Sequence, residues 1–491
     1  MTANDFIQLV CRDLTFSPTA DQLQALDIFT HFIADRNPDV AMIMSGAAGT
    51  GKTWLAGALV KTLARLGQKM VLLAPTGRAA KVLTQHTGTT ALTIHRKIYR
   101  EKTYTGLPGM FALNDNLHTD TLFIVDESSM ISNSNGASET AFGTGCLLDD
   151  LITFVYGGRN CRIMFIGDKA QLPPIGEKVS PALSAETLGY HGLKVYLANM
   201  QEVVRQQTES GILYNATVIR LMQNNIAGNV LPKIRLDRFA DIQVVTGEDL
   251  VESIASSYSR VGIDDTIVIT RSNKRANIYN TGIRSQILGQ EERLCRGDRL
   301  MIVKNNYMAT AGLAAHHDTR QDAERIPAFI ANGDTCRIMR VRGTRKLYGF
   351  EFADAVLTFP DYDDFELQTT LMLDTLTSDA PALTKQQQQQ LYDAVTADYS
   401  DMPRKAERMA KLRNDRHYNA LQIKYGYAVT CHKAQGGQWA HVYLDQGYIT
   451  GETITEDYIN WLYTAFTRAT EKLFLVNWHE KQIEKSTHSF S

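Results

Sequence analysis

The stretch that decides the fold is Gly46-Ala47-Ala48-Gly49-Thr50-Gly51-Lys52-Thr53, which fits the pattern GxxxxGK[ST]. It follows the apolar run AMIMS (41–45) and precedes TWLAGALVKTLARLG, which has the pattern of a helix. Glycines let successive backbone N–H groups converge on phosphate oxygens, and a helix N-terminus adds partial positive charge. We therefore expect a phosphate-binding loop in which Lys52 reaches the outer phosphates and Thr53 helps to hold Mg²⁺.

Polar residues follow two further apolar runs at positions that suit phosphate chemistry. TLFIV (121–125) delivers Asp126 and Glu127, and RIMFI (162–166) is followed closely by Gln171. Asp126 is placed to hold Mg²⁺ through its water shell, and Glu127 to orient or deprotonate an attacking water. Gln171 would sense the γ-phosphate or that water. Acidic residues also cap helices, but the upstream phosphate loop favours the catalytic interpretation.

Short apolar runs alternate with helical patterns in two parts of the chain, which is typical of parallel sheets covered by helices. We therefore predict an α/β fold with two such sheets, the second interrupted by a long insertion. The first set of runs is KMVLLA (69–74), TLFIV and RIMFI; the second is DTIVIT (265–270), YAVTC (427–431), HVYLD (441–445) and KLFLV (472–476).

The insertion differs in sequence pattern from the rest of the chain. Its short runs RLMIV, TCRIMRV, KLYGFEF and AVLTF, separated by turn residues, predict a small β-barrel. An acidic stretch at 347–384 and a helical stretch with five glutamines at 386–390 follow. The predicted domains are 1–236, with a hairpin insertion at about 97–119; 237–290 together with 421–491; and the accessory domain at 291–420.

Composition excludes several classes of protein. The 491 residues carry a net charge of −2, so a polybasic protein that holds nucleic acid by bulk charge is excluded. Six scattered cysteines without a CxxC pair predict a reducing, cytoplasmic location, nucleoid-associated in a bacterium. No apolar run approaches the roughly 20 residues of a membrane span, so no membrane association is expected.

Seven short motifs in order resemble those of the superfamily 1 helicases, and within them the superfamily 1B RecD/Dda-like branch. They are APTGRAAKVL, TIH, VDESSM, FIGDKAQLPPIG, VVRQ, VTCHKAQG and LYTAFTRA. The resemblance implies two RecA-like motor domains, a β-hairpin in the first, and an SH3-like barrel with helical additions in the second. It also implies an ATP- and Mg²⁺-dependent helicase that moves 5′→3′ on single-stranded DNA and unwinds duplexes.

The same resemblance assigns further nucleotide contacts. Gln22 matches the glutamine that reads adenine, although Thr19 and Gln22 also fit a helix capping box, and both roles can hold at once. Arg205 and Arg468 match two arginines that contact the γ-phosphate. Gly436 fits a close backbone approach to the nucleotide.

DNA contacts are likewise implied by the motifs, while a histidine taken alone is more often structural. In the hairpin at about 97–119, Met110 or Phe111 would present an apolar wedge with Tyr104 on the opposing strand, or these side chains tack the hairpin to the body. The implied DNA contacts are Pro75, Thr76, Arg78, Thr93 and His95 in the first half and Thr270, Asn273, Thr430, His432 and Lys433 in the second.

Other functions fit parts of the same pattern. The chain is expected to act as a monomeric motor at junctions of single- and double-stranded DNA, with possible protein partners in replication, repair or recombination. Alternatives are a translocase that remodels protein–DNA complexes, an RNA-directed member of the superfamily, or a nucleotide-gated DNA-binding or loading module. The two arginines and Gln171 argue against a passive switch, which has less need of charge that stabilises a transition state.

Overall fold

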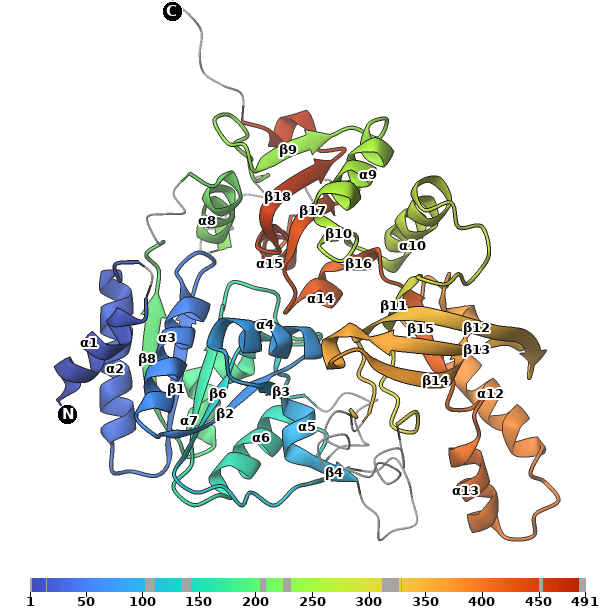
Figure 1. Ribbon diagram of the computed structural model, residues 1–491, viewed down its shortest axis with the longest axis horizontal. Helices are drawn as coiled ribbons and strands as arrows, with labels where there is room; N and C mark the ends of the chain where they lie inside the picture. Colours follow the sequence, from blue (N-terminus) through green and yellow to red (C-terminus); the bar gives the residue numbers. More distant parts are fainter. Residues whose placement is uncertain are drawn as a thin grey trace, which may run out of the picture. The chain divides into compact units, whose positions relative to one another are not determined.

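The computed structural model describes residues 2–14, 16–101, 111–134, 143–203, 209–223, 231–310, 326–327, 329–449 and 454–484 (Figure 1). The chain forms two compact units. The first comprises Met1–Arg100, Ala112–Thr246 and Ala434–Ser491, and the second comprises Glu101–Phe111 and Gly247–Lys433. In the described part of the chain, no helix has the length and apolar character needed to cross a membrane.

A six-stranded sheet forms the centre of the first unit, and its strands lie in the order β3-β2-β6-β7-β1-β8. Every neighbouring pair is parallel, which confirms the predicted parallel sheet. The near-continuous apolar runs follow from this architecture, because central strands are covered on both faces. The strands are β1 (Val40–Gly46), β2 (Lys69–Ala74), β3 (Ala91–Thr93), β6 (Thr121–Val125), β7 (Arg162–Gly167) and β8 (Lys194–Met200).

Helices bury an aromatic and aliphatic core against this sheet. Phe29 and Phe32 of α2 are almost completely buried, and Phe6 of α1 stacks on Phe29 with ring centroids 5.8 Å apart. Each large apolar side chain buried in this way contributes about 1.5–3 kcal/mol. These helices are α1 (Ala3–Arg12), α2 (Ala20–Ala34), α3 (Lys52–Arg65), α4 (Gly77–Thr87), α5 (Ile94–Ile98), α6 (Leu147–Tyr156) and α7 (Ala185–Tyr190). A further helix of the first unit, α8 (Gly211–Gln223), packs on α15 (Glu456–Phe466) rather than on this sheet.

The strands of the second predicted sheet occur in both units. In the first unit, β17 (Trp439–Asp445), β18 (Ala469–Val476) and β9 (Ile242–Val245) pair in parallel, and α15 spans Glu456–Phe466. In the second unit, β10 (Thr266–Thr270) pairs in parallel with β16 (Ala428–Thr430), and α10 spans Asn273–Gly282. The domain boundaries proposed from sequence therefore stay predictions.

A closed five-stranded barrel in the second unit confirms the expected accessory barrel. One expectation was wrong: KLYGFEF is not a single strand, because β12 ends at Leu347 and β13 begins at Phe350. Tyr348 and Gly349 between them have φ of 57° and 80°, and two consecutive positive φ values make a tight hairpin turn. The barrel strands are β11 (Arg299–Ile302), β12 (Thr335–Leu347), β13 (Phe350–Phe359), β14 (Phe365–Met372) and β15 (Leu421–Tyr425).

Two helices extend the barrel, and the glutamine tract belongs to one of them. α12 (Lys385–Ala397) begins with a capping box between Thr384 and Gln387, and α13 (Lys405–Asn414) follows. Leu391, Val395 and Leu412 pack with Phe350 and Phe352 of the barrel. The glutamines at 386–390 therefore form the N-terminal part of α12, and the apolar side chains that follow them pack on the barrel.

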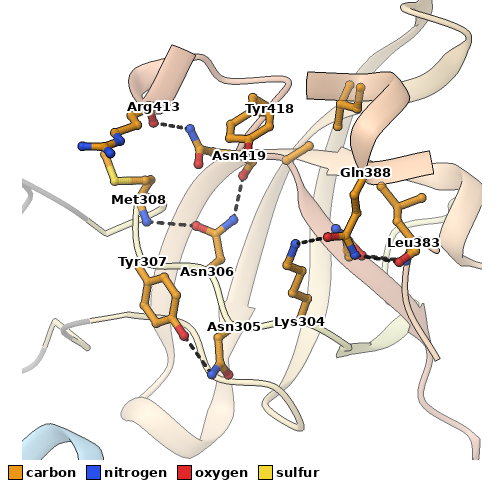
Figure 2. Close-up of a pocket in the computed structure, with 13 residues that line it drawn as sticks. Lys304, Asn305, Asn306, Tyr307, Met308, Leu383, Gln388, Arg413, Tyr418 and Asn419 are labelled. Carbon is orange, nitrogen blue, oxygen red and sulfur yellow. Dashed lines mark hydrogen bonds between the residues drawn. The ribbon is translucent and has the colours of Figure 1, made fainter. Parts of the chain in front are cut away.

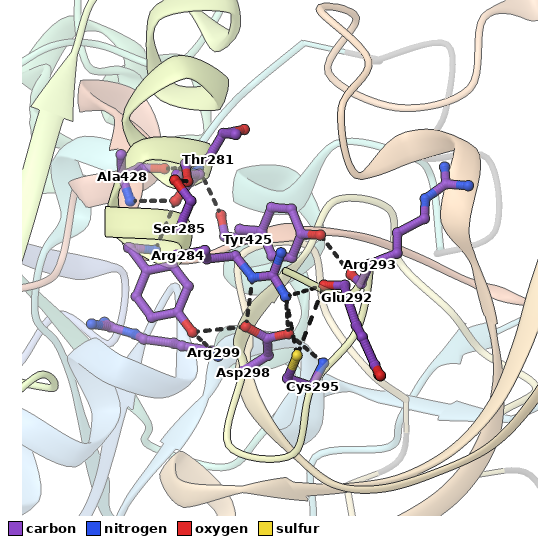
Figure 3. A network of polar contacts seen from close by, with 12 residues as sticks. Thr281, Arg284, Ser285, Glu292, Arg293, Cys295, Asp298, Arg299, Tyr425 and Ala428 are labelled. Carbon is purple, nitrogen blue, oxygen red and sulfur yellow. Dashed lines mark hydrogen bonds and ion pairs between the residues drawn. The ribbon is translucent and has the colours of Figure 1, made fainter. Parts of the chain in front are cut away.

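A buried ion pair joins α10 to the barrel within the second unit (Figure 3). Arg284, in the π-helical turn after α10, donates to both carboxylate oxygens of Asp298, at 2.8 and 2.9 Å. Its guanidinium also lies 4.4 Å from the centre of the Tyr425 ring, and the Tyr427 hydroxyl donates to Asp298. Because Arg284 and Asp298 are both buried, this pair needs all of these contacts to offset its desolvation.

The acidic stretch at 347–384 is partly neutralised by basic side chains of the same unit. Arg345 binds both oxygens of Asp354, at 2.7 and 2.9 Å, and Arg416 also contacts that carboxylate. These arginines hold the pKa of Asp354 well below its usual range. Arg293 pairs with Glu351 through one carboxylate oxygen. Two carboxylates of the stretch, Asp354 and Glu351, are therefore neutralised by arginines of the same unit.

Candidate nucleotide-binding site

The loop between β1 and α3 has the backbone conformation that a phosphate cradle requires. Gly49 and Gly51 have φ of 79° and 77°, which side chains disfavour. A Cβ at Gly46 would lie 2.9 Å from the Met200 carbonyl oxygen and 2.7 Å from Thr50 Oγ1, so that glycine is required for packing. Lys52 Nζ donates to the carbonyl oxygens of Gly46 and Ala47, at 2.7 and 2.8 Å. The ammonium group thus lies over the loop that it is predicted to serve.

Gln22 is held on the loop by its own side chain. Its Oε1 accepts from Thr19 N at 3.0 Å, which completes the capping box of α2, and its Nε2 donates to Thr50 O at 2.8 Å. The side chain is fully buried. The capping alternative therefore describes this structure, and Gln22 positions the phosphate loop; its adenine role stays a prediction.

Asp126 and Glu127 lie at the carboxyl end of β6, which is the direct neighbour of β7 in the sheet. Burial and repulsion by Glu127 raise the pKa of Asp126 to about 7. Glu127 has a φ of 51°, in the left-handed region, a conformation that costs energy and clusters at functional sites. In the described residues, no group of three or more His, Cys, Asp or Glu forms a metal cluster. Carboxylate oxygens such as those of Asp126 and Glu127 are protein ligands that Mg²⁺ prefers.

Gln171 follows β7 and is buried, with 6% of its surface exposed. Its Oε1 makes no hydrogen bond, and a buried polar atom of this kind calls for a ligand or water. The next residue is fixed on both sides: Leu172 N donates to Thr464 Oγ1 at 2.8 Å, and Leu172 O accepts from Gln435 Nε2 at 2.7 Å. The loop thus holds an amide with unused hydrogen-bonding capacity.

Of the two arginines predicted to contact the γ-phosphate, the structure describes only Arg468. Arg468 is 2% exposed and donates to the carbonyl oxygens of Thr464 and Gly437, at 3.0 and 3.2 Å. Arg205 lies outside the described residues. Gly436 has a φ of 72° and approaches Thr76 closely, since a Cβ there would lie 3.1 Å from Thr76 Oγ1. The contact of Gly436 with a nucleotide stays a prediction.

One residue of this region was missed by the sequence reasoning. Tyr463 of α15 donates to Asp168 Oδ2 at 2.6 Å, and its hydroxyl accepts from Ala48 N of the phosphate loop at 2.8 Å. It stands in the motif LYTAFTRA, five residues before Arg468. The motif LYTAFTRA, which contains the predicted arginine, therefore also contains the signal for Tyr463.

The predicted DNA contacts of the first unit gather at the carboxyl ends of the adjacent strands β2 and β3. Thr76 and Thr93 cap the helices α4 and α5, accepting from Ala79 N and Arg96 N, and Pro75 precedes the first cap. Arg78 lies 4.2 Å from the centre of the Trp439 ring. Burial lowers the pKa of His95 to about 4, so this histidine is neutral at physiological pH.

In the second unit the predicted DNA contacts differ in accessibility. Thr270 is fully buried, and its hydroxyl donates to Ser272 O at 3.0 Å, whereas Asn273 is the first residue of α10. Thr430 ends β16, and His432 is exposed. Lys433 contacts Asn332, and burial lowers the pKa of this lysine to about 8. Of these five residues, Thr270 is the one whose burial disfavours direct contact with DNA.

Phe111 was predicted as a wedge, with attachment of the hairpin as the alternative. The residue begins β5 (Phe111–Leu113) and is 4% exposed. Its ring centroid lies 5.3 Å from that of Tyr307 and 6.0 Å from that of Phe329, within the second unit. This packing favours attachment over a presented wedge. Met110 and Tyr104 lie outside the described residues.

A pocket of about 240 Å³ lies in the second unit, between the loop at 304–308 and the extension that carries α12 and α13 (Figure 2). Lys304 and Arg413 are its charged lining residues, and amide side chains such as Asn306 and Gln388 supply much of the rest. Lys304 Nζ donates to Gln388 Oε1 at 3.4 Å, and burial lowers the pKa of this lysine. No feature of the sequence pointed to this pocket.

Comparison with known proteins bears on the family. A model described as an AAA domain matches residues 19–227, and a model of a UvrD-like helicase C-terminal domain matches residues 425–476. The chain is 32% identical over 136 residues to the ATP-dependent RecD2 DNA helicase of Deinococcus radiodurans. Together these matches support a superfamily 1 helicase. The Deinococcus match covers 27% of the chain and only 16% of that protein.

Similarities over most of the chain's length are weaker. An uncharacterized protein of Acanthamoeba polyphaga mimivirus is 21% identical over 506 residues, covering 89% of the chain and 96% of that protein. A Bacteroides Pif1 helicase in complex with ADP-AlF3 and single-stranded DNA has 14% identity and a TM-score of 0.45, over 96% and 95% of the two chains. Pif1 helicase from Candida albicans has 13% identity and a TM-score of 0.42, over 96% and 97%.

Proposed function

We propose that this protein hydrolyses ATP to move 5′→3′ along single-stranded DNA and to unwind duplex DNA. The observation that carries the proposal is the set of groups at the carboxyl ends of β1, β6 and β7. There the glycine loop with Lys52, the carboxylates Asp126 and Glu127, and the unsatisfied Gln171 oxygen follow neighbouring strands of one sheet. Ligands of open parallel sheets bind at this edge.

The residues divide the chemistry between them. Loop N–H groups and Lys52 bind the β- and γ-phosphates, Glu127 orients or deprotonates the attacking water, and Gln171 contacts the γ-phosphate or that water. Thr53 and Asp126 would hold Mg²⁺, which neutralises charge on the phosphates when bound. Arg468 and Arg205 would add positive charge at the γ-phosphate.

Support for DNA as the track comes from a relative and from the predicted contacts. The Deinococcus relative is named an ATP-dependent DNA helicase. Helix caps such as Thr76 and Thr93 offer hydroxyls and backbone N–H groups, which suit phosphates without reading bases. We further propose that the protein acts as a monomer at single-strand to double-strand junctions, inside a reducing compartment that suits its six free cysteines.

Strand displacement on duplexes that carry a 5′ or a 3′ single-stranded tail tests the proposal. We expect ATP-dependent displacement from the 5′-tailed duplex, and none with Lys52→Ala. Displacement from the 3′-tailed duplex alone would reverse the polarity. ATPase activity stimulated by single-stranded DNA without strand separation would favour a remodelling translocase. Stimulation by RNA alone would favour the RNA-directed alternative, and no stimulation by either would contradict a motor.

A further inference from the structure

Tyr463 joins the phosphate loop to the loop that carries Gln171. Its hydroxyl accepts from Ala48 N at 2.8 Å and donates to Asp168 Oδ2 at 2.6 Å. All three residues belong to the first unit. Tyr463 is 1% exposed and Asp168 is 2% exposed, so water does not replace these bonds in the structure. Both bonds are short, and the one to the carboxylate has the length of a charge-assisted bond.

Asp168 in turn organises the chain up to Gln171. Its Oδ1 accepts from Ala170 N at 3.0 Å, and its backbone oxygen accepts from Gln171 N at 3.3 Å. Leu172 is held at the other end by Thr464, the residue next to Tyr463. Burial and the Asp168 charge raise the pKa of Tyr463 well above its usual value, so its hydroxyl stays protonated and keeps donating to Asp168.

The Ala48 N–H has a second prospective partner. It belongs to the loop whose backbone N–H groups are predicted to bind phosphate, and one N–H makes one good hydrogen bond. A phosphate oxygen that takes this N–H must displace the Tyr463 hydroxyl. The displaced hydroxyl remains protonated and still donates to Asp168. The loss of its bond to Ala48 therefore affects Asp168, the residue that fixes the Gln171 loop.

We propose that Tyr463 is a latch that competes with phosphate for the Ala48 N–H and thereby couples nucleotide binding to the position of Gln171. The latch rests on the proposed nucleotide site and adds a positioning residue to it. It lowers nucleotide affinity, because one loop hydrogen bond must be exchanged on binding. It aids turnover, because the same tyrosine anchors Asp168. A tyrosine that only filled space would do neither.

Tyr463→Phe tests the latch, since it keeps the ring and removes only the hydroxyl. We expect a fluorescent, non-hydrolysable ATP analogue to bind the variant about 3- to 10-fold more tightly, the range that one net hydrogen bond covers. We expect kcat for ATP hydrolysis to fall in the same variant. Tighter binding together with slower turnover separates a latch from general damage, which weakens both.

Tyr458→Phe is the matched control. Tyr458 lies in the same helix, is equally buried at 1% exposed, and donates to Gln446 Oε1 at 2.8 Å, away from the phosphate loop. It should leave the affinity for the analogue unchanged. Unchanged or weaker binding by Tyr463→Phe would overturn the latch while the wild-type protein still binds the analogue. Failure of the wild-type protein to bind it would instead contradict the proposed nucleotide site, and the latch with it.

Discussion

At the scale of single residues, the surroundings of Asp126 disfavour its ionised form. Burial and Glu127 raise the pKa of this carboxyl to about 7, whereas in an unfolded chain it ionises near its usual value of about 4. Ionisation of Asp126 therefore costs the folded protein free energy, and this cost grows as pH rises from about 4 to about 7. Without a bound cation, Asp126→Asn should melt at a higher temperature than the wild type at pH 8.

The same carboxyl should make Mg²⁺ binding depend on pH. Only the ionised form binds a cation, so Mg²⁺ affinity should rise roughly tenfold between pH 6 and pH 8. Titration of Mg²⁺ against binding of an ATP analogue at the two pH values measures this change. Asp126→Asn should weaken Mg²⁺ binding and flatten the dependence. An equal dependence in the variant would assign the titration to another group.

At the scale of elements, the Arg284–Asp298 pair fixes the turn after α10 to the start of the barrel. Removing one partner of a buried pair leaves the other charge uncompensated, so Asp298→Asn should lower the free energy of unfolding of the second unit by about 3–5 kcal/mol. Chemical denaturation followed by circular dichroism measures the loss. The double variant Arg284→Met, Asp298→Leu should recover much of it, because two apolar side chains leave no buried charge.

The Arg293–Glu351 pair supplies the control for that experiment. Arg293 is 39% exposed and Glu351 is 25% exposed at the side chain, so solvent screens their attraction. Arg293→Met should cost no more than about 1 kcal/mol. If Asp298→Asn cost equally little, the buried pair would not be what holds α10 on the barrel.

Phe111 belongs to the same scale, because its ring packs against Tyr307 and Phe329 within the second unit. Phe111→Ala should lower the free energy of unfolding by about 3–5 kcal/mol, and Phe111→Leu by much less, since leucine refills most of the space. Stability and strand displacement should fall together. A variant of normal stability that loses only unwinding, while keeping DNA-stimulated ATPase activity, would restore the wedge interpretation.

At the scale of the whole molecule, the net charge of −2 predicts a weak response to salt. Among the residues predicted to contact DNA in the described part of the chain, Arg78 and Lys433 carry positive charge at pH 7, whereas His95 is neutral. Each phosphate neutralised on a single strand contributes about −0.7 to the slope of log K against log salt. We expect a slope of about −1 to −3 from fluorescence anisotropy titrations. A slope near −6 would reveal a basic surface that the motifs do not include.

The sequence predicted most of what depends on local pattern. Apolar runs located β1, β2, β6 and β7, and the spacing of turns indicated the barrel. It did not reveal the Tyr348–Gly349 turn, because KLYGFEF is apolar enough to continue as a strand. Nor did it distinguish an exposed Phe111 from a buried one, since burial depends on Tyr307 and Phe329, far along the chain. The unsatisfied Gln171 oxygen and the hydrogen bonds of Tyr463 were not predictable from the sequence either, because they too depend on residues far apart in the chain.

The position of Trp439 beneath Arg78 has an optical consequence. All four tryptophans, Trp54, Trp439, Trp461 and Trp478, belong to the first unit, and the second unit absorbs through tyrosine and phenylalanine. Indole emission therefore reports on the first unit alone, and a guanidinium 4.2 Å from the ring centre lies within range to perturb it. A DNA strand that draws Arg78 away should change the emission of the unlabelled protein, and Trp439→Phe should remove that signal.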